Sequence, residues 1–290
     1  MEMYYHTLAI SELTIRIKTD IQLRVQKEFL PFLVQTEKPD YTAVFQCVDA
    51  LPPIPGEILH EDNCYRVHPD GKGGYIRSFF DAPRDRAPYA VARFDDRLPG
   101  IRVDYLSKGL RCVSELQNSF FHVGFESLLI RSHRLCLHAA CVDTPLGGIL
   151  FSGPSGIGKS TQAALWQSFR SAKQINGDRP ILEKRAEGWK AWGSPYAGSS
   201  HCHVNESCDV KAIVMLKQAA ACELHRLPLP RAFRAVWSGL TMNSWDEAAV
   251  TEASTLAMEL IEAVPVYEFA CTPDEQAVAY LEAALRKDLQ

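Results

Sequence analysis

The stretch GPSGIGKS occupies residues 153–160 and carries the strongest functional signal in this chain of 290 residues. It fits the phosphate-binding pattern G-x-x-x-x-G-K-[ST] at every fixed position. Glycines let such a loop wrap with its backbone N–H groups turned inward, toward phosphate oxygens. Lys159 then supplies an ammonium to the β- and γ-phosphates of a nucleotide, and the Ser160 hydroxyl ligates Mg²⁺. The residues predicted to bind ATP are Gly153, Pro154, Ser155, Gly156, Ile157, Gly158, Lys159, Ser160 and Thr161.

The neighbouring segments suit such a loop. GILFS (148–152) is an apolar run typical of a buried strand, and STQAALW (160–166) is typical of a helix. A helix that begins at the loop adds the positive end of its dipole to the phosphate site. This context makes a chance match to the pattern less plausible.

Asp178, in the segment INGDR (175–179), is the first acidic residue after the next predicted strand (172–176). A strand reached by a crossover from the preceding helix runs parallel, so its carboxyl end faces the phosphate site. A carboxylate there can hold Mg²⁺ or accept the proton of an attacking hydroxyl group. The structural alternative is an ordinary turn aspartate after a glycine.

His138 is the second candidate catalytic residue. If strands 135–142 and 148–152 form a hairpin centred near Pro145, His138 lies opposite Ser152, at the foot of the loop. Taken alone, a histidine in an apolar strand is more often a hydrogen-bonded core residue.

Together, His138 in LHAACV, the loop GPSGIGKST and Asp178 in NGDR resemble the HPr kinase/phosphorylase family and its wider relatives, which include phosphoenolpyruvate carboxykinase. The resemblance covers about residues 130–220. It implies a kinase that uses ATP and Mg²⁺, with Asp178 as base and metal partner and His138 beside the transferred phosphate.

The chain departs from that family in two ways. A single aspartate followed by Arg179 stands where HPr kinases have paired acids, and the later arginine-glycine signature is not evident. Phosphorylase activity and HPr as a substrate are therefore not expected. The chain looks more similar to HPr-kinase-like proteins encoded beside peptide-modifying enzymes, some of which phosphorylate a serine in a lasso-peptide precursor.

The two halves of the sequence differ in character. Residues 4–105 contain short β-branched and aromatic runs separated by turn formers, with one helix expected over 20–35 and another over 114–133. The second half alternates strands and helices, which predicts an α/β fold. The expected organisation is a smaller α+β domain (1–112) followed by a P-loop kinase domain like that of HPr kinase and phosphoenolpyruvate carboxykinase (113–290), with the boundary between 106 and 132.

Further elements are predicted in the second half. These are a hairpin over 181–194, a strand over 210–216, helices near 230–242 and 245–263, a strand over 264–270, and a final helix opened by a capping box at Thr272–Glu275.

Composition excludes several classes of function. A formal net charge of −4 does not favour nucleic acid as a partner. The sequence has no run of 18 apolar residues and no signal peptide at its start, so no membrane span and a cytoplasmic location are expected. The nine cysteines form no C-x-x-C pair, and His201, Cys202, His203 and Cys208 are interpreted as loop residues with reduced thiols rather than as a metal site.

The sequence thus predicts an ATP-dependent kinase that phosphorylates a hydroxyl, most plausibly of Ser or Thr, on a peptide or protein, including a modified-peptide precursor. A nucleotide-sensing protein without kinase activity, a small-molecule kinase and a carboxykinase-type enzyme are the alternatives. Arg179 and Arg226 are candidate stabilisers of phosphate charge, and the loop 193–201 is a candidate acceptor site. Whether the chain forms a homo-oligomer is left open.

Overall fold

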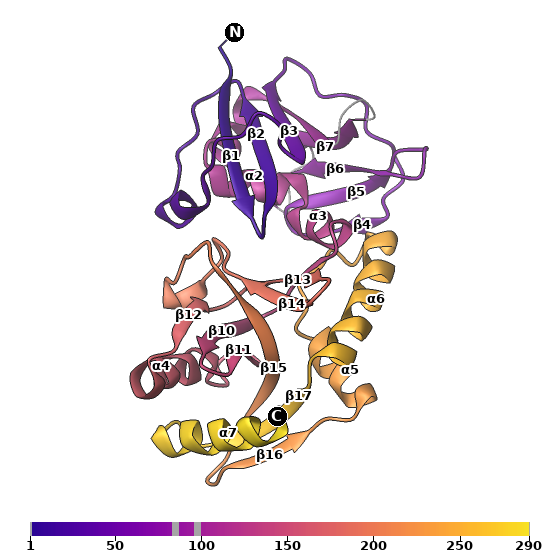
Figure 1. Cartoon of the computed structure of the whole chain (residues 1–290). Coiled ribbons are helices and arrows are strands. Elements are labelled where there is room, and N and C mark those ends of the chain that lie inside the picture. Colours follow the sequence, from indigo (N-terminus) through magenta and orange to yellow (C-terminus); the bar gives the residue numbers. More distant parts are fainter. Residues whose placement is uncertain (1, 83–86, 96–99, 290) are drawn as a thin grey trace. The chain divides into compact units, whose positions relative to one another are not determined.

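The computed structural model describes residues 2–82, 87–95 and 100–289. The chain forms two compact units, Met1–Phe125 and Glu126–Gln290, each built on a sheet with helices, so that the protein is of mixed α/β type (Figure 1). The sequence places the domain boundary after residue 112, and the limits of the independently folding domains stay a prediction.

The first unit contains an eight-stranded sheet in its described part, in the order β1-β2-β3-β8-β7-β6-β5-β4. The pairs β2–β3 and β3–β8 are parallel, and the other neighbours are antiparallel. The strands are β1 (Tyr4–Ile10), β2 (Leu13–Thr19), β3 (Tyr41–Cys47), β4 (His60–Glu61), β5 (Tyr65–Pro69), β6 (Tyr75–Phe79), β7 (Ala90–Asp95) and β8 (Gly100–Tyr105).

Alternating side chains explain why this sheet forms. Leu13, Ile15 and Ile17 are all buried on one face of β2, as the period of two along a strand requires. Helix α2 (Leu116–Val123) packs on the sheet through His122, whose ring lies against the rings of Phe45 and Phe79. The strands expected between 4 and 105 are therefore present, with a helix on the sheet.

The helix expected over 20–35 is wrong. Only Lys27–Phe32 is helical, as a 3₁₀ turn that contains Pro31. The backbone of Arg24 is instead hydrogen-bonded to residues of another segment, to Ser114 O at 2.9 Å and from Leu116 N at 3.0 Å. Because the N–H and C=O groups of Arg24 are bonded to residues 114 and 116, they are not available for the hydrogen bonds of a helix.

The single helix expected over 114–133 is also wrong, because it is divided. Helix α2 ends at Gly124, which has a positive φ of 67°, and α3 (Phe125–Arg131) follows. A left-handed glycine at this position terminates a helix. Two shorter helical segments precede α2, the 3₁₀ turn Ser107–Gly109 and α1 (Leu110–Val113).

The second unit contains a nine-stranded sheet in its described part. One path runs in the order β12-β10-β11-β15-β14-β13-β9, and β17 pairs with both β15 and β16. The strands are β9 (Arg134–Cys136), β10 (Ala139–Thr144), β11 (Gly147–Ser152), β12 (Lys173–Asn176), β13 (Ile181–Arg185), β14 (Gly188–Trp192), β15 (Ser207–Gln218), β16 (Glu223–Arg226) and β17 (Val266–Cys271).

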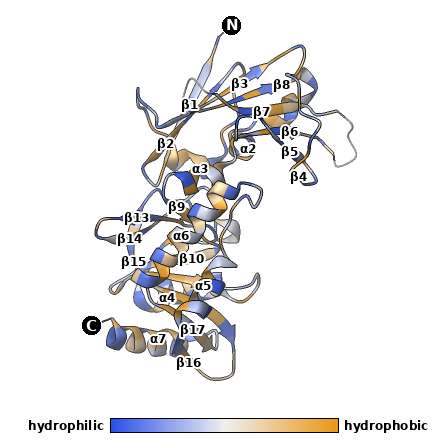
Figure 2. Ribbon diagram, turned by 90° about the vertical axis from the view of Figure 1, so that its right-hand side faces the viewer, coloured by the Kyte–Doolittle hydropathy of each residue, from blue (hydrophilic) through white to orange (hydrophobic). Residues whose placement is uncertain are grey.

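Helices cover both faces of this sheet. On one face, α4 (Lys159–Arg170) and α7 (Glu275–Asp288) pack Trp166 and Leu281 against Phe151 and Phe269. In Figure 2, α7 carries both hydrophilic and hydrophobic residues, as a helix with one buried face should.

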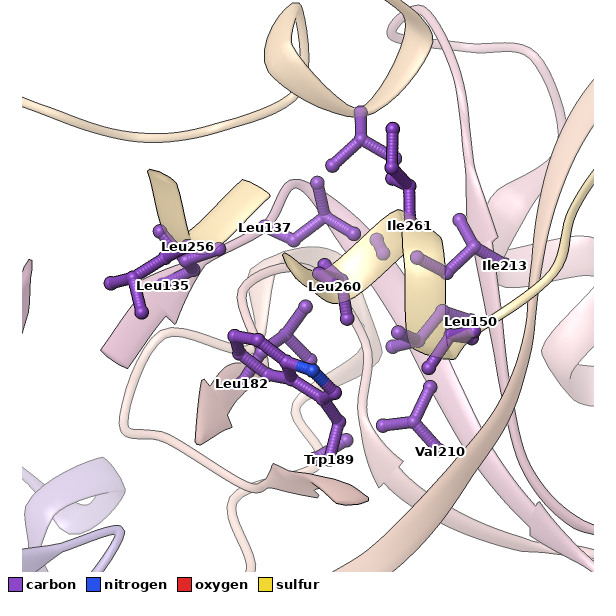
Figure 3. Close-up of a cluster of buried hydrophobic side chains, with 14 of the residues drawn as sticks. Leu135, Leu137, Leu150, Leu182, Trp189, Val210, Ile213, Leu256, Leu260 and Ile261 are labelled. Carbon is purple, nitrogen blue, oxygen red and sulfur yellow. The ribbon is translucent and has the colours of Figure 1, made fainter. Parts of the chain in front are cut away.

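On the other face, α5 (Leu229–Trp237) and α6 (Glu247–Ala263) pack against β10, β11 and β15. Figure 3 shows this cluster, in which Leu260 and Ile261 of α6 lie among Leu150, Ile213 and other apolar side chains. Successive residues of β10 and β11 alternate between the two clusters, which is why these strands read as continuously apolar.

The strand expected over 135–142 is interrupted at Leu137 and His138. The N–H of Leu137 donates to Pro180 O (3.3 Å) and the N–H of His138 to Gly239 O (2.8 Å), so these two residues separate β9 from β10. The hairpin of β10 and β11 does turn at Pro145, but Ala139 rather than His138 pairs with Ser152. The predicted register is therefore wrong by one residue.

The final helix is capped differently from the prediction. Its N-cap is Asp274, whose side chain accepts a hydrogen bond from Ala277 N at 3.0 Å, rather than Thr272. In the described part of the chain, no helix combines the length and the apolar character needed to cross a membrane.

Candidate active site

The loop of residues 153–160, hereafter the glycine-rich loop, connects β11 to α4. Gly153, Gly156 and Gly158 have φ values of 134°, 78° and 115°, which L-amino acids with a side chain rarely adopt. A Cβ at Gly156 or Gly158 would meet nothing within 4 Å. These two glycines therefore keep the inner side of the loop open, as close approach of a phosphate requires.

Lys159 is the first residue of α4, and its side chain folds over this loop. Its Nζ donates to Gly153 O (3.0 Å) and Pro154 O (3.1 Å), and the residue is only 7% exposed. Burial lowers the pKa of Lys159, the carboxylate of Asp178 opposes this shift and Arg179 reinforces it. The ammonium is thus close enough to Asp178 to respond to its charge.

Asp178 and His138, predicted separately, are brought together. His138 Nε2 lies 3.1 Å from Asp178 Oδ1, and about 30% of each side chain is exposed (30% and 28%). Both are therefore fixed by a partner and still open to a substrate. The second carboxylate oxygen of Asp178 lies 3.5 Å from Arg179 Nε.

Strand directions explain this meeting. β12 and β11 are both antiparallel to β10, which lies between them, so β11 and β12 run in the same direction and end at the same edge of the sheet. Two hydrogen bonds join the three strands at that edge: Ala139 N donates to Asp178 O at 2.9 Å, and Ser152 Oγ donates to His138 O at 2.9 Å. The foot of the glycine-rich loop therefore holds the histidine directly.

The protonation state of His138 follows from its surroundings. Burial lowers its pKa most, the positive charge of Lys159 lowers it further, and Asp178 raises it by less. With its pKa below the ordinary 6.5, His138 is neutral at pH 7, and Nε2 carries the proton that it donates to Asp178.

Sequence reasoning missed Asn176, the last residue of β12. Its Oδ1 accepts hydrogen bonds from the backbone N–H groups of Asp178 (2.9 Å) and Arg179 (2.7 Å), and the residue is fully buried. Its Nδ2 donates to Ser194 O (3.2 Å). An asparagine two residues before the aspartate is typical of an Asx-turn, and that signal was present in NGD.

The loop 193–201, predicted as a possible acceptor site, packs against Asp178. Gly198 has a φ of 54°, and a Cβ placed there would lie 2.9 Å from Asp178 Cβ. Ser194 is buried and donates from Oγ to Arg179 O at 2.7 Å. The loop therefore shapes one side of the carboxylate.

The two candidate arginines differ. Arg179 lies beside Asp178 and donates to Thr241 Oγ1. Arg226 lies on β16 and its Nη1 is 3.7 Å from Asp288 Oδ2, at the end of α7. Of these two residues, only Arg179 belongs to the group around Asp178.

Mg²⁺ prefers oxygen ligands and is commonly held by one or two protein groups together with phosphate oxygens. Ser160, exposed on the first turn of α4, and Asp178 offer a hydroxyl and a carboxylate of this kind. Within the described residues, no group of three His, Cys, Asp or Glu side chains could hold a metal without a ligand. The donor set thus fits Mg²⁺ that arrives with a nucleotide.

The sequence matches no protein-family model, and no curated protein matches it. Among solved structures, the chain is similar to the HPr(Ser) kinase/phosphatase from Coxiella burnetii, at 13% identity and a TM-score of 0.32. That similarity covers 53% of this chain and 89% of the other. The likeness is weak and concerns the fold alone.

Proposed function

We propose that the protein is an ATP-dependent kinase that transfers the γ-phosphate to a hydroxyl group, that of a serine or threonine in a peptide or protein. The observation that carries this proposal is the His138–Asp178 pair at 3.1 Å, at the same sheet edge as the glycine-rich loop and within electrostatic reach of Lys159. A site that only binds phosphate needs neither a proton acceptor nor a histidine that orients it.

The residues have distinct roles in the transfer. Backbone N–H groups of the glycine-rich loop and of the first turn of α4 bind phosphate oxygens. Lys159 exchanges its two carbonyl partners for phosphate oxygens, where its charge opposes the negative charge that builds up. Ser160 and Asp178 would hold Mg²⁺, which would neutralise phosphate charge.

Asp178 receives the proton. As the acceptor oxygen forms its bond to the γ-phosphorus, the bond from that phosphorus to the β–γ bridging oxygen breaks, and ADP leaves with the electron pair. The hydroxyl proton passes to the Asp178 carboxylate. Neutral His138 donates from Nε2 to Oδ1 and so fixes which carboxylate oxygen faces the acceptor.

The peptide acceptor is supported by the first unit and by the resemblance of the sequence. A strand-rich unit can recognise an extended peptide by adding it to a sheet edge. β1 is an edge strand of this sheet. The segment of Leu33 and Val34 pairs with its outer edge at residues 7 and 8, so a peptide would add beside residues 4–6.

Transfer from γ-labelled ATP in the presence of Mg²⁺ tests the function. We expect the parent protein to label serine- or threonine-containing peptides. Asp178→Asn, which keeps the shape but loses the proton acceptor, should slow turnover about 10²-fold or more, with ATP affinity changed far less. Lys159→Ala should instead weaken ATP binding, because it removes a charge-assisted contact to phosphate.

Asp209→Asn is the matched control, because Asp209 pairs with Lys190 on the surface, away from Asp178. Unchanged turnover in Asp178→Asn would remove the aspartate from the reaction. ATP binding without transfer to any acceptor would identify a nucleotide-sensing protein, and labelling of small molecules alone would contradict the peptide acceptor.

A further inference from the structure

A second feature of the phosphate edge is a cavity of about 400 Å³ beside the glycine-rich loop. It is lined by loop residues 156–158, by Thr161 and Gln162 of α4, and by residues 216–219 and 271–273, where β15 and β17 end. β15 pairs in parallel with β11, and β17 with β15, so all three strands end at this edge. Ligands of open α/β sheets bind at such carboxyl ends.

The cavity and Asp178 lie on opposite sides of β11. In the sheet order, β12 and β10 are on one side of β11, and β15 and β17 are on the other. A nucleotide with its terminal phosphate at Asp178 and its other phosphates on the first turn of α4 therefore extends toward β15 and β17. Its nucleoside arrives at the cavity.

The walls of the cavity suit a flat heterocycle with one polar edge. Ile157, Leu216 and Pro273 provide apolar surface for the faces of a ring. Gln162 is only 3% exposed, and its Nε2 donates to Cys271 Sγ (3.3 Å) and Thr272 O (3.4 Å). Its Oε1 is buried with no hydrogen-bond partner among the described residues.

A buried acceptor without a donor destabilises the protein unless something supplies that donor. The terminal amide torsion of glutamine is broad, so rotation about it can present Oε1 to the cavity in exchange for the contacts of Nε2 with Cys271 and Thr272. The exocyclic amino group of adenine is such a donor, whereas guanine carries an acceptor oxygen at the same position. Of the described residues that line the cavity, none is an Asp or Glu that could take the N–H donors of guanine instead.

We propose that this cavity binds the base of the nucleotide and that Gln162 selects adenine over guanine. The proposal rests on the proposed function, because the position of the base follows from the position of the phosphates. Gln162 is thus a specificity-determining residue one helical turn away from the residues that hold phosphate.

The cavity is tested by filling it. Ala219 is exposed at its rim and holds Cys271 O only through its backbone N–H (3.1 Å), so Ala219→Phe adds a ring without removing a hydrogen bond. Calorimetry should show ATP binding weakened about tenfold or more, with inorganic tripolyphosphate binding unchanged. Ala220→Phe, the next exposed residue and not part of the lining, is the matched control and should bind ATP as the parent does.

Base selection is tested by Gln162→Leu, which keeps the volume and removes the acceptor. The ratio of ATP to GTP affinity should fall toward one, while tripolyphosphate affinity stays at the parent value. An unchanged ratio, or an Ala219→Phe variant that binds ATP normally, overturns the base site but leaves the kinase proposal standing if tripolyphosphate still binds. A parent protein that binds neither ATP nor tripolyphosphate overturns the proposed function itself.

Discussion

Asn176 shows how a residue that touches no reactant can determine the position of one that does. Its Oδ1 holds the N–H groups of Asp178 and Arg179, and its amide nitrogen is tied to Ser194. The backbone on which the carboxylate stands therefore depends on a side chain two residues earlier. Burial of Asn176 keeps water from replacing these bonds.

We expect Asn176→Ala to lower turnover about 10²-fold, since a misplacement of roughly 1 Å has that effect on a reacting group. ATP affinity should stay near that of the parent, because Lys159 and the loop glycines are unchanged. Steady-state kinetics with γ-labelled ATP, compared with calorimetry of ATP binding, separates the two quantities.

Asn176→Asp retains an acceptor oxygen for the two N–H groups and should recover part of the lost turnover. Both variants need a thermal-unfolding measurement to show that they are folded at the assay temperature. Loss of ATP binding in parallel with turnover would mean that Asn176 supports the fold generally rather than Asp178 in particular.

The sequence alone predicts some residues of the candidate active site and misses others. The spacing of the glycines and the Lys-Ser pair that follows them identify the loop, because each fixed position has a local physical reason. The contact of His138 with Asp178 depends on β10 lying between β11 and β12, which local patterns do not specify. The Asx-turn of Asn176 is visible in the sequence, but its amide nitrogen is fixed by a hydrogen bond to Ser194, 18 residues later.

Among the elements, helix α2 carries a buried histidine that makes the fold sensitive to acid. His122 is buried, with its Nε2 2.9 Å from Tyr89 Oη and its Nδ1 2.6 Å from Asn118 O. Arg77 donates to the carbonyl oxygens of Phe121 and His122, at the end of α2, and so adds positive charge nearby. Burial lowers the pKa of His122 to about 4.

This shift predicts a loss of stability in acid. His122 takes up a proton below about pH 6.5 in the unfolded chain but only below about pH 4 in the folded chain. The free energy of unfolding should therefore be highest above pH 6.5 and fall as the pH drops toward 4. At pH 5, protonation of His122 should lower the free energy of unfolding by about 2 kcal/mol relative to neutral pH.

Urea unfolding at pH 7 and pH 5 measures this loss. His122→Gln, which has no proton to gain, should flatten the dependence on pH, even if the variant is less stable at pH 7. His225→Gln is the control for replacing a histidine outside the buried cluster, since that side chain is 60% exposed. Equal slopes for the parent and His122→Gln would contradict the prediction.

Element boundaries show the same limit of local sequence patterns. The helix that follows the glycine-rich loop and the hairpin of β13 and β14 are present as predicted, because their apolar spacing and their turn residues lie within the element. The prediction of a helix over 20–35 is wrong because the backbone of Arg24 forms hydrogen bonds with residues 114 and 116. The prediction of one strand over 135–142 is wrong because the N–H groups of residues 137 and 138 donate to the carbonyl oxygens of Pro180 and Gly239.

For the whole molecule, we propose that the two units divide the tasks of the proposed kinase. The residues proposed to bind the nucleotide and to transfer phosphate all lie in Glu126–Gln290. The first unit has its own core and an eight-stranded sheet in its described part, and we assign it to acceptor binding.

A protein consisting of residues 126–290 should therefore bind ATP with nearly the affinity of the full chain, while phosphorylating peptides far more slowly. Calorimetry and transfer from γ-labelled ATP to a peptide library measure these two properties. The slow hydrolysis of ATP by water serves as the internal control, since it needs no acceptor site. Equal peptide phosphorylation by the truncated and full-length proteins would assign the first unit a different role.

The interruption between β9 and β10 has a consequence for how the reaction centre responds to different acceptors. His138 is hydrogen-bonded through its N–H to Gly239 and through its carbonyl to Ser152, and Asp178 is hydrogen-bonded through its carbonyl to Ala139. Lys159, by contrast, is hydrogen-bonded to Gly153 O and Pro154 O only through the end of a side chain with four rotatable bonds. In the proposed reaction, Asp178 as proton acceptor is therefore held by the backbone, whereas the ammonium of Lys159 can adjust to the phosphate. We therefore expect the hydroxyl of every acceptor to approach Asp178 at the same angle, because the position of the carboxylate does not adjust to the acceptor.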